Sequence, residues 1–181
     1  LEGSHQYINA SAAILACLTN KELEIENLKV ENFINKINWP GRLHKLSGKL
    51  SKQYQDLDIW VDVAHNVLGF RSLRSWIESF KIINPVFIIG LGIKKDYIGI
   101  IKEIKKTKPS LICFLSEYNF HCHKPEKLKK FSTQLEIESH IGKSINETLD
   151  FIARRNKTNK KQLTLITGSI GLIGEILNKN N

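Results

Sequence analysis

The chain alternates between short apolar runs and longer amphipathic segments over most of its length. The clearest apolar runs cover residues 59–64, 86–91, 111–115 and 163–167, and a weaker run covers 135–141. Short continuous runs rich in β-branched and aromatic side chains are typical of strands that are buried on both faces of a sheet. The pattern therefore predicts four buried strands and a fifth, weaker one.

The segments between these runs place their apolar residues at helical spacing. They predict helices over 67–80, 96–107, 124–132 and 143–156, and a last helix through the segment IGLIGEIL at 170–177. Strands that alternate with helices imply right-handed crossovers between parallel strands. We therefore predict an α/β fold, with a Rossmann-like, mostly parallel sheet flanked by helices.

The first part of the chain has a different pattern. Residues 4–19 predict one helix, and 21–38 contain the pattern of a second, shorter helix. Pro40 and Gly41 then break the helical pattern, as a turn does. An edge strand is expected directly after them, at 42–46.

The length and these boundaries suggest two unequal parts. A chain of 181 residues can hold one ordinary domain and a small additional piece. We place the division between a helical segment, 1–38, and an α/β domain, 39–181. The chain begins at Leu1 and contains no methionine, so we expect it to be a piece of a longer protein.

The charge balance favours anionic partners. The chain has 27 Lys and Arg against 18 Asp and Glu, a net charge of +9. Such a surface attracts phosphorylated small molecules, acidic lipids or nucleic acid. No basic and aromatic motif of a nucleic-acid-binding module is present, so we expect a small anionic ligand and consider nucleic acid an unlikely partner.

The remaining composition indicates a cytoplasmic location. No apolar run approaches the roughly 20 residues that a membrane span needs, and residues 1–4 lack the features of a signal peptide. The three cysteines are scattered and form no CxxC pair, so we expect reduced thiols and no zinc site. His121, Cys122 and His123 are adjacent, and adjacent side chains rarely converge on one metal, so we expect a loop there.

Ligands of open α/β sheets bind beyond the carboxyl ends of the strands, and the first polar strand end is at 62–66. Asp62 precedes the end of an apolar run, where a carboxylate is costly unless it is paired, capped or liganded. His65 follows at the turn and is a candidate for contact with a ligand. Asn66 is either a helix N-cap or a further site residue.

The next strand end is the segment GLGIKKD at 90–96. Gly90 and Gly92 free the backbone, and Lys95 and Asp96 are candidate site residues before a helix. Asp96 is also a candidate N-cap. The chain contains no complete phosphate-loop motif, so the two glycines alone are weak evidence for one.

The last strand end is the segment TGS at 167–169, which enters the final helix. Free N–H groups at a helix N-terminus suit a carboxylate or a phosphate, so Gly168 and Ser169 are candidate ligand contacts. Ser169 is equally well placed as an N-cap. Arg42, just after the predicted boundary, has a guanidinium that suits bidentate contact with a phosphate.

Taken in order, five motifs resemble the family of folylpolyglutamate synthase/dihydrofolate synthase, within the Mur ligase superfamily. The motifs are LEGSHQYINASAAILA, WPGR, DVAHN, GLGIKKDY and TGSIGLIGEIL. Their order and spacing match this family over nearly the whole chain. The peptidoglycan branch of the superfamily has a related D-Y-A-H-N-P motif, but GSHQ, WPGR and TGSIGLIGE favour the folate branch.

The resemblance implies an ATP-dependent ligase that joins L-glutamate to dihydropteroate or a folate through an acyl phosphate, with Mg²⁺ on the ATP phosphates. By the family pattern, Arg42 and Asp62 contact the nucleotide, and His65 and Ser169 hold the incoming glutamate. The family's phosphate-binding loop, Mg²⁺ ligands and most of its folate site belong to a central ATPase domain. Residues 1–38 would be the tail of that domain, so we expect no catalytic residue, no metal ligand and no ligase activity in this chain alone.

The sequence also departs from the family pattern. Val63 replaces a glycine in DVAHN and is expected to add bulk beside the crevice. Val67, Lys94 and Gly171 replace a usual proline, aspartate and tyrosine. Two alternatives therefore stay open: a non-catalytic remnant or interaction module with this fold, and a fragment of a peptidoglycan Mur ligase.

Overall fold

The computed structural model describes residues 3–20, 37, 39–116, 121–157 and 160–181. Within these residues the core is a six-stranded sheet with the order β1-β2-β6-β3-β4-β5. The strands are β1 (His44–Lys45), β2 (Leu57–Asp62), β3 (Val86–Ile89), β4 (Leu111–Leu115), β5 (Ser139–Gly142) and β6 (Gln162–Thr167). β1 is an antiparallel edge strand and the other pairings are parallel, which confirms the predicted fold class.

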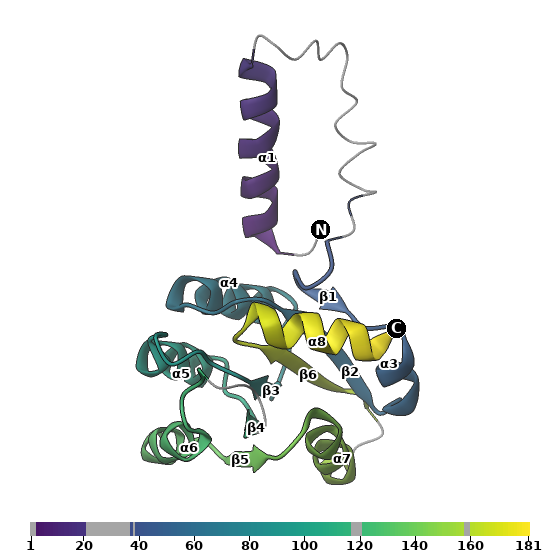
Figure 1. The fold of residues 1–181 in the computed structure, drawn as a ribbon, viewed down its shortest axis with the longest axis vertical. Helices are drawn as coiled ribbons and strands as arrows, with labels where there is room; N and C mark the ends of the chain where they lie inside the picture. The colour runs from purple at the N-terminus through teal and green to yellow at the C-terminus, as the bar shows by residue number, and fades with distance from the viewer. Residues whose placement is uncertain (1–2, 21–36, 38, 117–120, 158–159) are drawn as a thin grey trace.

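Seven helices are described, and all but α1 pack around the sheet (Figure 1). They are α1 (Ser4–Thr19), α3 (Lys49–Gln53), α4 (Val67–Ser79), α5 (Tyr97–Lys106), α6 (Pro125–Gln134), α7 (Ile145–Arg155) and α8 (Ile170–Asn180). The predicted helices between strands are confirmed to within a few residues at their ends. The helix expected at 21–38 falls almost entirely outside the described residues. α3 was missed, because a five-residue helix with one buried side chain, Leu50, has no detectable period.

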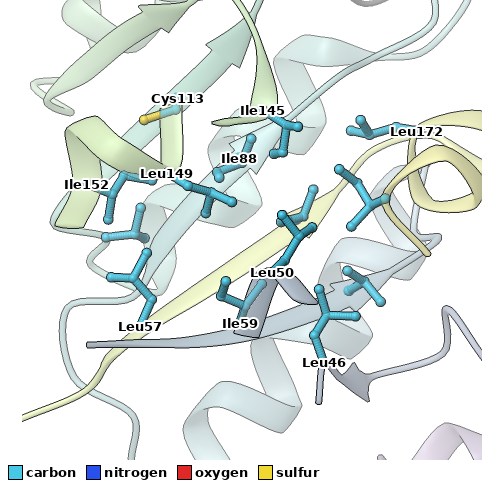
Figure 2. Close-up of a cluster of buried hydrophobic side chains, with 14 of the residues drawn as sticks. Leu46, Leu50, Leu57, Ile59, Ile88, Cys113, Ile145, Leu149, Ile152 and Leu172 are labelled. Atoms are coloured by element: carbon cyan, nitrogen blue, oxygen red, sulfur yellow. The ribbon is translucent and has the colours of Figure 1, made fainter. Parts of the chain in front are cut away.

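Side chains alternate between two hydrophobic clusters, one on each face of the sheet. On β3, Val86 and Ile88 pack with residues of α3, α7 and α8, and Figure 2 shows part of this cluster. Phe87 and Ile89 point the other way and pack against α4, α5 and α6. Because both faces are covered, the strands read as continuous apolar runs in the sequence.

The prediction of a strand at 135–141 places its first residue too early. Leu135 still closes α6, because its N–H donates to Phe131 O at 3.2 Å. Glu136 then has φ 59°, which no strand accommodates. The strand therefore begins at Ser139, and the apolar Ile137 is buried by the turn that connects α6 to β5.

α1 projects from the α/β body on the side of α4 (Figure 1). Its described apolar side chains are largely exposed, including Ile8 at 71% and Leu15 at 62%. The division at residue 38 remains a prediction, although the separate position of α1 is compatible with it. Within the described part of the chain, no helix combines the length and the apolar character that a membrane crossing requires.

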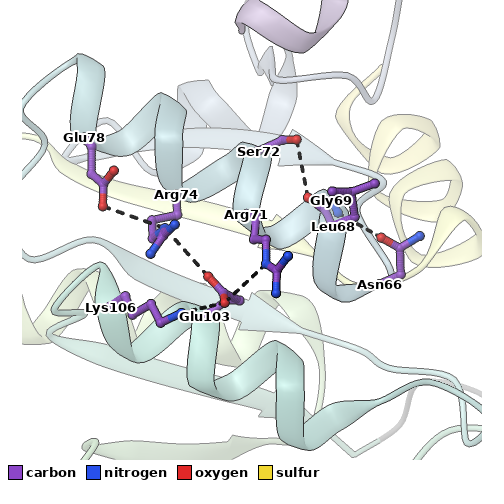
Figure 3. Close-up of polar contacts among 9 residues, drawn as sticks. All are labelled: Asn66, Leu68, Gly69, Arg71, Ser72, Arg74, Glu78, Glu103 and Lys106. Atoms are coloured by element: carbon purple, nitrogen blue, oxygen red, sulfur yellow. Dashed lines mark hydrogen bonds and ion pairs between the residues drawn. The ribbon is translucent and has the colours of Figure 1, made fainter.

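A buried glutamate connects α4 to α5 (Figure 3). Glu103 of α5 is 4% exposed, and its carboxylate lies 2.7 Å from Lys106 Nζ, 3.5 Å from Arg71 Nε and 3.7 Å from Arg74 Nε. The hydrogen bond from Lys106 is the main cause that holds the pKa of Glu103 below its usual value, against the opposing effect of burial. The charge of Glu103 therefore stabilises the contact between the two helices.

Replacing this charge tests the contact. We expect Glu103→Gln to lower the free energy of unfolding at pH 7 by about 1–3 kcal/mol, because the ion pairs with Arg71 and Arg74 of α4 are lost and the hydrogen bond with Lys106 loses one of its two charges. A lowered pKa stabilises the fold above the unfolded-state pKa, and this contribution disappears as the pH falls through the folded-state pKa. The difference between wild type and variant in urea denaturation should therefore shrink below about pH 4.5. Glu126→Gln, at an exposed glutamate of α6, is the control; an equal effect of both variants would contradict this role.

Candidate functional site

The strand order brings the polar loops after β2, β6 and β3 next to one another. Thr167 at the end of β6 pairs with Asp62 on one side and with Ile89 on the other. Backbone bonds join the loops: Gly168 N–H donates to Ala64 O at 2.9 Å and Gly90 N–H donates to Thr167 O at 3.3 Å. α8 follows β6 on the opposite face from α4 and α5, so this edge is the kind of crevice where open α/β sheets bind ligands.

Asp62 lies beneath this edge and binds two separate segments of backbone. Its side chain is 4% exposed; Oδ1 accepts the N–H of Ala64 at 2.8 Å and Oδ2 accepts the N–H of Leu43 at 2.9 Å. The bond to Ala64 also explains why β2 ends at Asp62 and not at residue 64 as predicted, since that N–H no longer faces a neighbouring strand. Asp62 therefore positions the chain on both sides of the site.

Arg42 is exposed and lies next to the Leu43 N–H that Asp62 binds. The preceding Gly41 has φ 83°, and a Cβ there would lie 3.0 Å from Ile173 and 3.3 Å from Val63. Gly41 O also accepts the N–H of Val63 at 2.9 Å. The backbone that carries Arg42 is thus packed tightly against β2 and α8, while its side chain is accessible.

The position of Val63 differs from expectation. Its side chain is 9% exposed and belongs to the hydrophobic cluster that contains Ile173 of α8. The extra bulk relative to glycine therefore fills space between Gly41 and α8 and does not add to the crevice.

His65 and Asn66 have different roles in the loop after β2. Asn66 caps α4 by accepting the N–H of Gly69 at 2.8 Å (Figure 3), which confirms its predicted structural role. His65 is half-buried, with Nδ1 2.9 Å from Val63 O. A carbonyl oxygen only accepts, so Nδ1 carries the proton in this bond, and Nε2 of the neutral ring is a hydrogen-bond acceptor.

The loop after β3, which contains the segment GLGIKKD, is held partly by His121 and His123, which lie outside that segment. Asp96 caps α5 by accepting the N–H of Gly99 at 2.9 Å, as its alternative role predicted. Lys95 is half-buried, and its carbonyl lies 2.9 Å from His123 Nε2. The HCH segment is confirmed as a loop before α6, and the Ile93 N–H donates to His121 O.

Gly168 and Ser169 begin α8 at the centre of the site. Gly168 has φ 110°, and a Cβ there would lie 2.6 Å from the backbone oxygen of Gly90, so only glycine fits. Ser169 is the N-cap residue and is half-buried, but its side chain accepts no capping bond from α8. The first-turn amides of this helix of 11 residues point toward the crevice side.

The structure thus brings Arg42, Asp62, His65, Gly168 and Ser169 to one edge of the sheet. Lys95 and Asp96 are at the same edge, one strand further along. Sequence reasoning missed His123, which supports the β3 loop, and no local signal connects it to residue 95. Among the described residues, no group of three or more His, Cys, Asp or Glu is placed to hold a metal ion.

The role of Asp62 is testable by removing one acceptor. In Asp62→Asn, an NH₂ group would face one of the two backbone N–H donors, so we expect a loss of about 2–4 kcal/mol in the free energy of unfolding. The matched control is Asp56→Asn at an exposed aspartate just before the same strand, which should change stability by less than about 0.5 kcal/mol. Chemical denaturation followed by circular dichroism provides both values; a neutral Asp62→Asn variant would contradict the assigned role.

Two glycines of the last segment offer a matched pair. We expect Gly168→Ala to destabilise the fold by about 2–4 kcal/mol, because it combines a left-handed backbone with a contact against Gly90 O. Gly174→Ala, inside α8 where a Cβ meets nothing within 4 Å, should stabilise by about 1 kcal/mol through helix propensity. Thermal denaturation of the two variants should therefore shift in opposite directions, and shifts of the same sign would refute this account.

Comparison with the sequences of known proteins supports the resemblance to folylpolyglutamate synthase/dihydrofolate synthase. No family model matches the chain. The dihydrofolate synthetase of Saccharomyces cerevisiae is 24% identical to it over 195 aligned positions, which cover 100% of the chain and 45% of the yeast protein. The chain therefore spans less than half of the length of this curated relative.

Solved structures show the same fold. A Mycobacterium tuberculosis folylpolyglutamate synthase complexed with ADP aligns over 100% of the chain and 41% of its own length, with TM-score 0.80 and 16% identity. Escherichia coli FolC in complex with DHPP and ADP aligns over 94% of the chain and 38% of its own length, with TM-score 0.73 and 19% identity. In sequence and in fold, the chain thus resembles the C-terminal portion of the folylpolyglutamate synthase/dihydrofolate synthase family of the Mur ligase superfamily.

Proposed function

We propose that this chain is the C-terminal part of an ATP-dependent ligase that adds L-glutamate to dihydropteroate or to a folate. The observation that carries the proposal is the convergence of Arg42, His65 and the N-terminus of α8 at one edge of the sheet, in a chain similar to a dihydrofolate synthetase. The remaining partners would be Mg²⁺ and a central ATPase domain, and the setting would be the cytoplasm. Residues 1–38 would belong to that ATPase domain.

In this proposal the substrate carboxylate takes the γ-phosphoryl group of ATP, which releases ADP and leaves an acyl phosphate. The amine of glutamate then attacks the acyl carbon, and phosphate and a proton leave as the amide forms. Mg²⁺ would neutralise charge on the phosphates during the first step. The residues of this chain would act by positioning the two substrates, which contributes about 7–11 kcal/mol in favourable cases.

Arg42 is the proposed phosphate contact. Its side chain is exposed, while its backbone is fixed by the bond from Leu43 to Asp62, so the guanidinium starts from a defined place. The fixed backbone limits where the guanidinium can reach, and its planar group suits bidentate contact with a phosphate. Asp62 would then act on the nucleotide through Arg42, as a positioning residue.

His65 and Ser169 are the proposed glutamate contacts. With Nδ1 bonded to Val63 O, the neutral imidazole offers Nε2 as an acceptor for the ammonium or amine of glutamate. The first-turn amides of α8 and the Ser169 hydroxyl suit one of its carboxylates. The loops after β2 and β6 would thereby hold an amino acid by its two kinds of charged group.

Ligase assays on the longer protein that contains this chain test the proposal. We expect ATP- and Mg²⁺-dependent transfer of radiolabelled glutamate to dihydropteroate, to tetrahydrofolate, or to both. Arg42→Ala should lower kcat/KM by about 10²-fold, as the loss of one oriented charged donor does. Arg154→Ala, at an exposed arginine of α7, is the matched control and should leave kcat/KM unchanged. His65→Gln should raise the KM for glutamate by about tenfold with little change for ATP.

Three outcomes would contradict the proposal. Transfer to a UDP-muramoyl substrate alone would indicate a peptidoglycan ligase, and no turnover with any acceptor would indicate a non-catalytic module. Turnover by the 181-residue chain alone would contradict the dependence on an upstream ATPase domain.

A further inference from the structure

A separate cavity of about 550 Å³ opens at the opposite edge of the sheet. The amino ends of β2 and β6 line it together with the end of α4 and the turn that follows. Asp58 at this edge is four residues before Asp62 on β2, so roughly 13 Å of strand separates the cavity from the candidate ligase site. Its volume lies within the range of small-molecule sites, about 300–1,000 Å³.

Three aromatic rings form one wall of the cavity. The centroids of Trp60 and Trp76 are 5.0 Å apart, and those of Trp76 and Phe80 are 5.6 Å apart. Phe80 is 60% exposed, and the neighbouring Ile83 is 79% exposed. The apolar surface beside these rings therefore faces solvent, where covering it with a ligand is favourable.

One of the three rings carries a buried polar group. The indole N–H of Trp76 is buried, and within the described residues it has no hydrogen-bond partner. Buried donors without a partner are rare in proteins, but this nitrogen is enclosed and does not itself reach the cavity.

The charges around the cavity are predominantly positive. Asp58 is already engaged, because Lys45 Nζ lies 2.6 Å from Oδ1 and the Trp60 indole N–H donates to Oδ2 at 3.0 Å. Lys160 and Lys161 also line the cavity, directly before the beginning of β6. An anion beside these lysines would meet favourable potential.

We propose that this cavity binds a planar aromatic anion, at a site distinct from the proposed ligase site. The flat ring lies mainly against Trp60 and Phe80, because Trp76 is only 4% exposed, and offset or edge contacts between rings are favourable. The carboxylate, sulfonate or phosphate of the ligand points to the side of Lys160 and Lys161. Aromatic surface and cationic side chains are both needed, so neither an uncharged aromatic compound nor a non-aromatic anion satisfies the site.

Intrinsic fluorescence tests the proposal directly. The chain has three tryptophans, and Trp39 is exposed and does not line the cavity. In the Trp39→Phe background, all tryptophan emission therefore comes from the cavity wall. We expect 2-naphthoate to change this emission with a saturable curve and a Kd of about 0.1–1 mM, the affinity expected of a ligand of this size. Binding of 2-naphthylmethanol and of cyclohexanecarboxylate should be at least about tenfold weaker.

Matched variants distinguish binding in the cavity from non-specific binding of the probe to the protein surface. Lys161→Glu should raise the Kd of 2-naphthoate by about fivefold, while Lys102→Glu, at an exposed lysine of α5, should not. Phe80→Ala should raise it by about tenfold, while Leu68→Ala, at an exposed residue of α4, the helix that Phe80 follows, should not. Thermal melts of each variant show whether the fold is retained.

The proposal is overturned by emission changes that do not saturate, by equal effects of each variant and its control, or by equal affinity for the three probes. It is also overturned if sedimentation shows a dimer of the chain that Phe80→Ala dissociates, because the aromatic surface would then be an interface between copies.

Discussion

The buried carboxylate of Asp62 holds together the part of the molecule on which the candidate site depends. Its two oxygens bind the backbone of Leu43, before the sheet, and of Ala64, after β2. A carboxylate inside a protein is costly unless its oxygens are bonded, so the two segments keep their relative position. In the sequence, Arg42 directly precedes Leu43 and His65 directly follows Ala64. This one side chain therefore fixes the backbone next to two of the proposed ligand contacts, Arg42 and His65.

The order of the strands supplies the rest of the site. β6 is inserted between β2 and β3, so the last strand of the chain contributes its loop to the middle of the crevice. Gly168 makes this insertion possible, because any larger residue would strike the backbone of Gly90 in the neighbouring loop. α8 then begins at Ser169 with its N-terminus at the same edge. The site thus combines residues that are more than a hundred positions apart in the chain.

Most of the fold was predictable from the sequence, because both faces of the sheet are covered. Continuous apolar runs such as 111–115 and the stripe of α4 are direct consequences of burial, and they coincide with β4 and α4. The errors occurred where burial does not repeat regularly. α3 is too short to show a period, and the apolar residues at 135 and 137 are buried by a turn with Glu136 in a left-handed conformation.

The sequence by itself determined the class of fold, the N-caps Asn66 and Asp96 and the polar strand ends, because each depends on residues close together in the chain. Only the tertiary structure decided what Asp62 and Val63 do. The partners of Asp62 include a backbone N–H 19 residues away, and the space beside Val63 is defined by α8, at the far end of the chain. The same is true of the aromatic cavity, whose walls come from β2, α4 and β6. Local sequence patterns indicate secondary structure and burial. Contacts between residues that are distant in the sequence depend on the order of the strands in the sheet, and no local pattern indicates them.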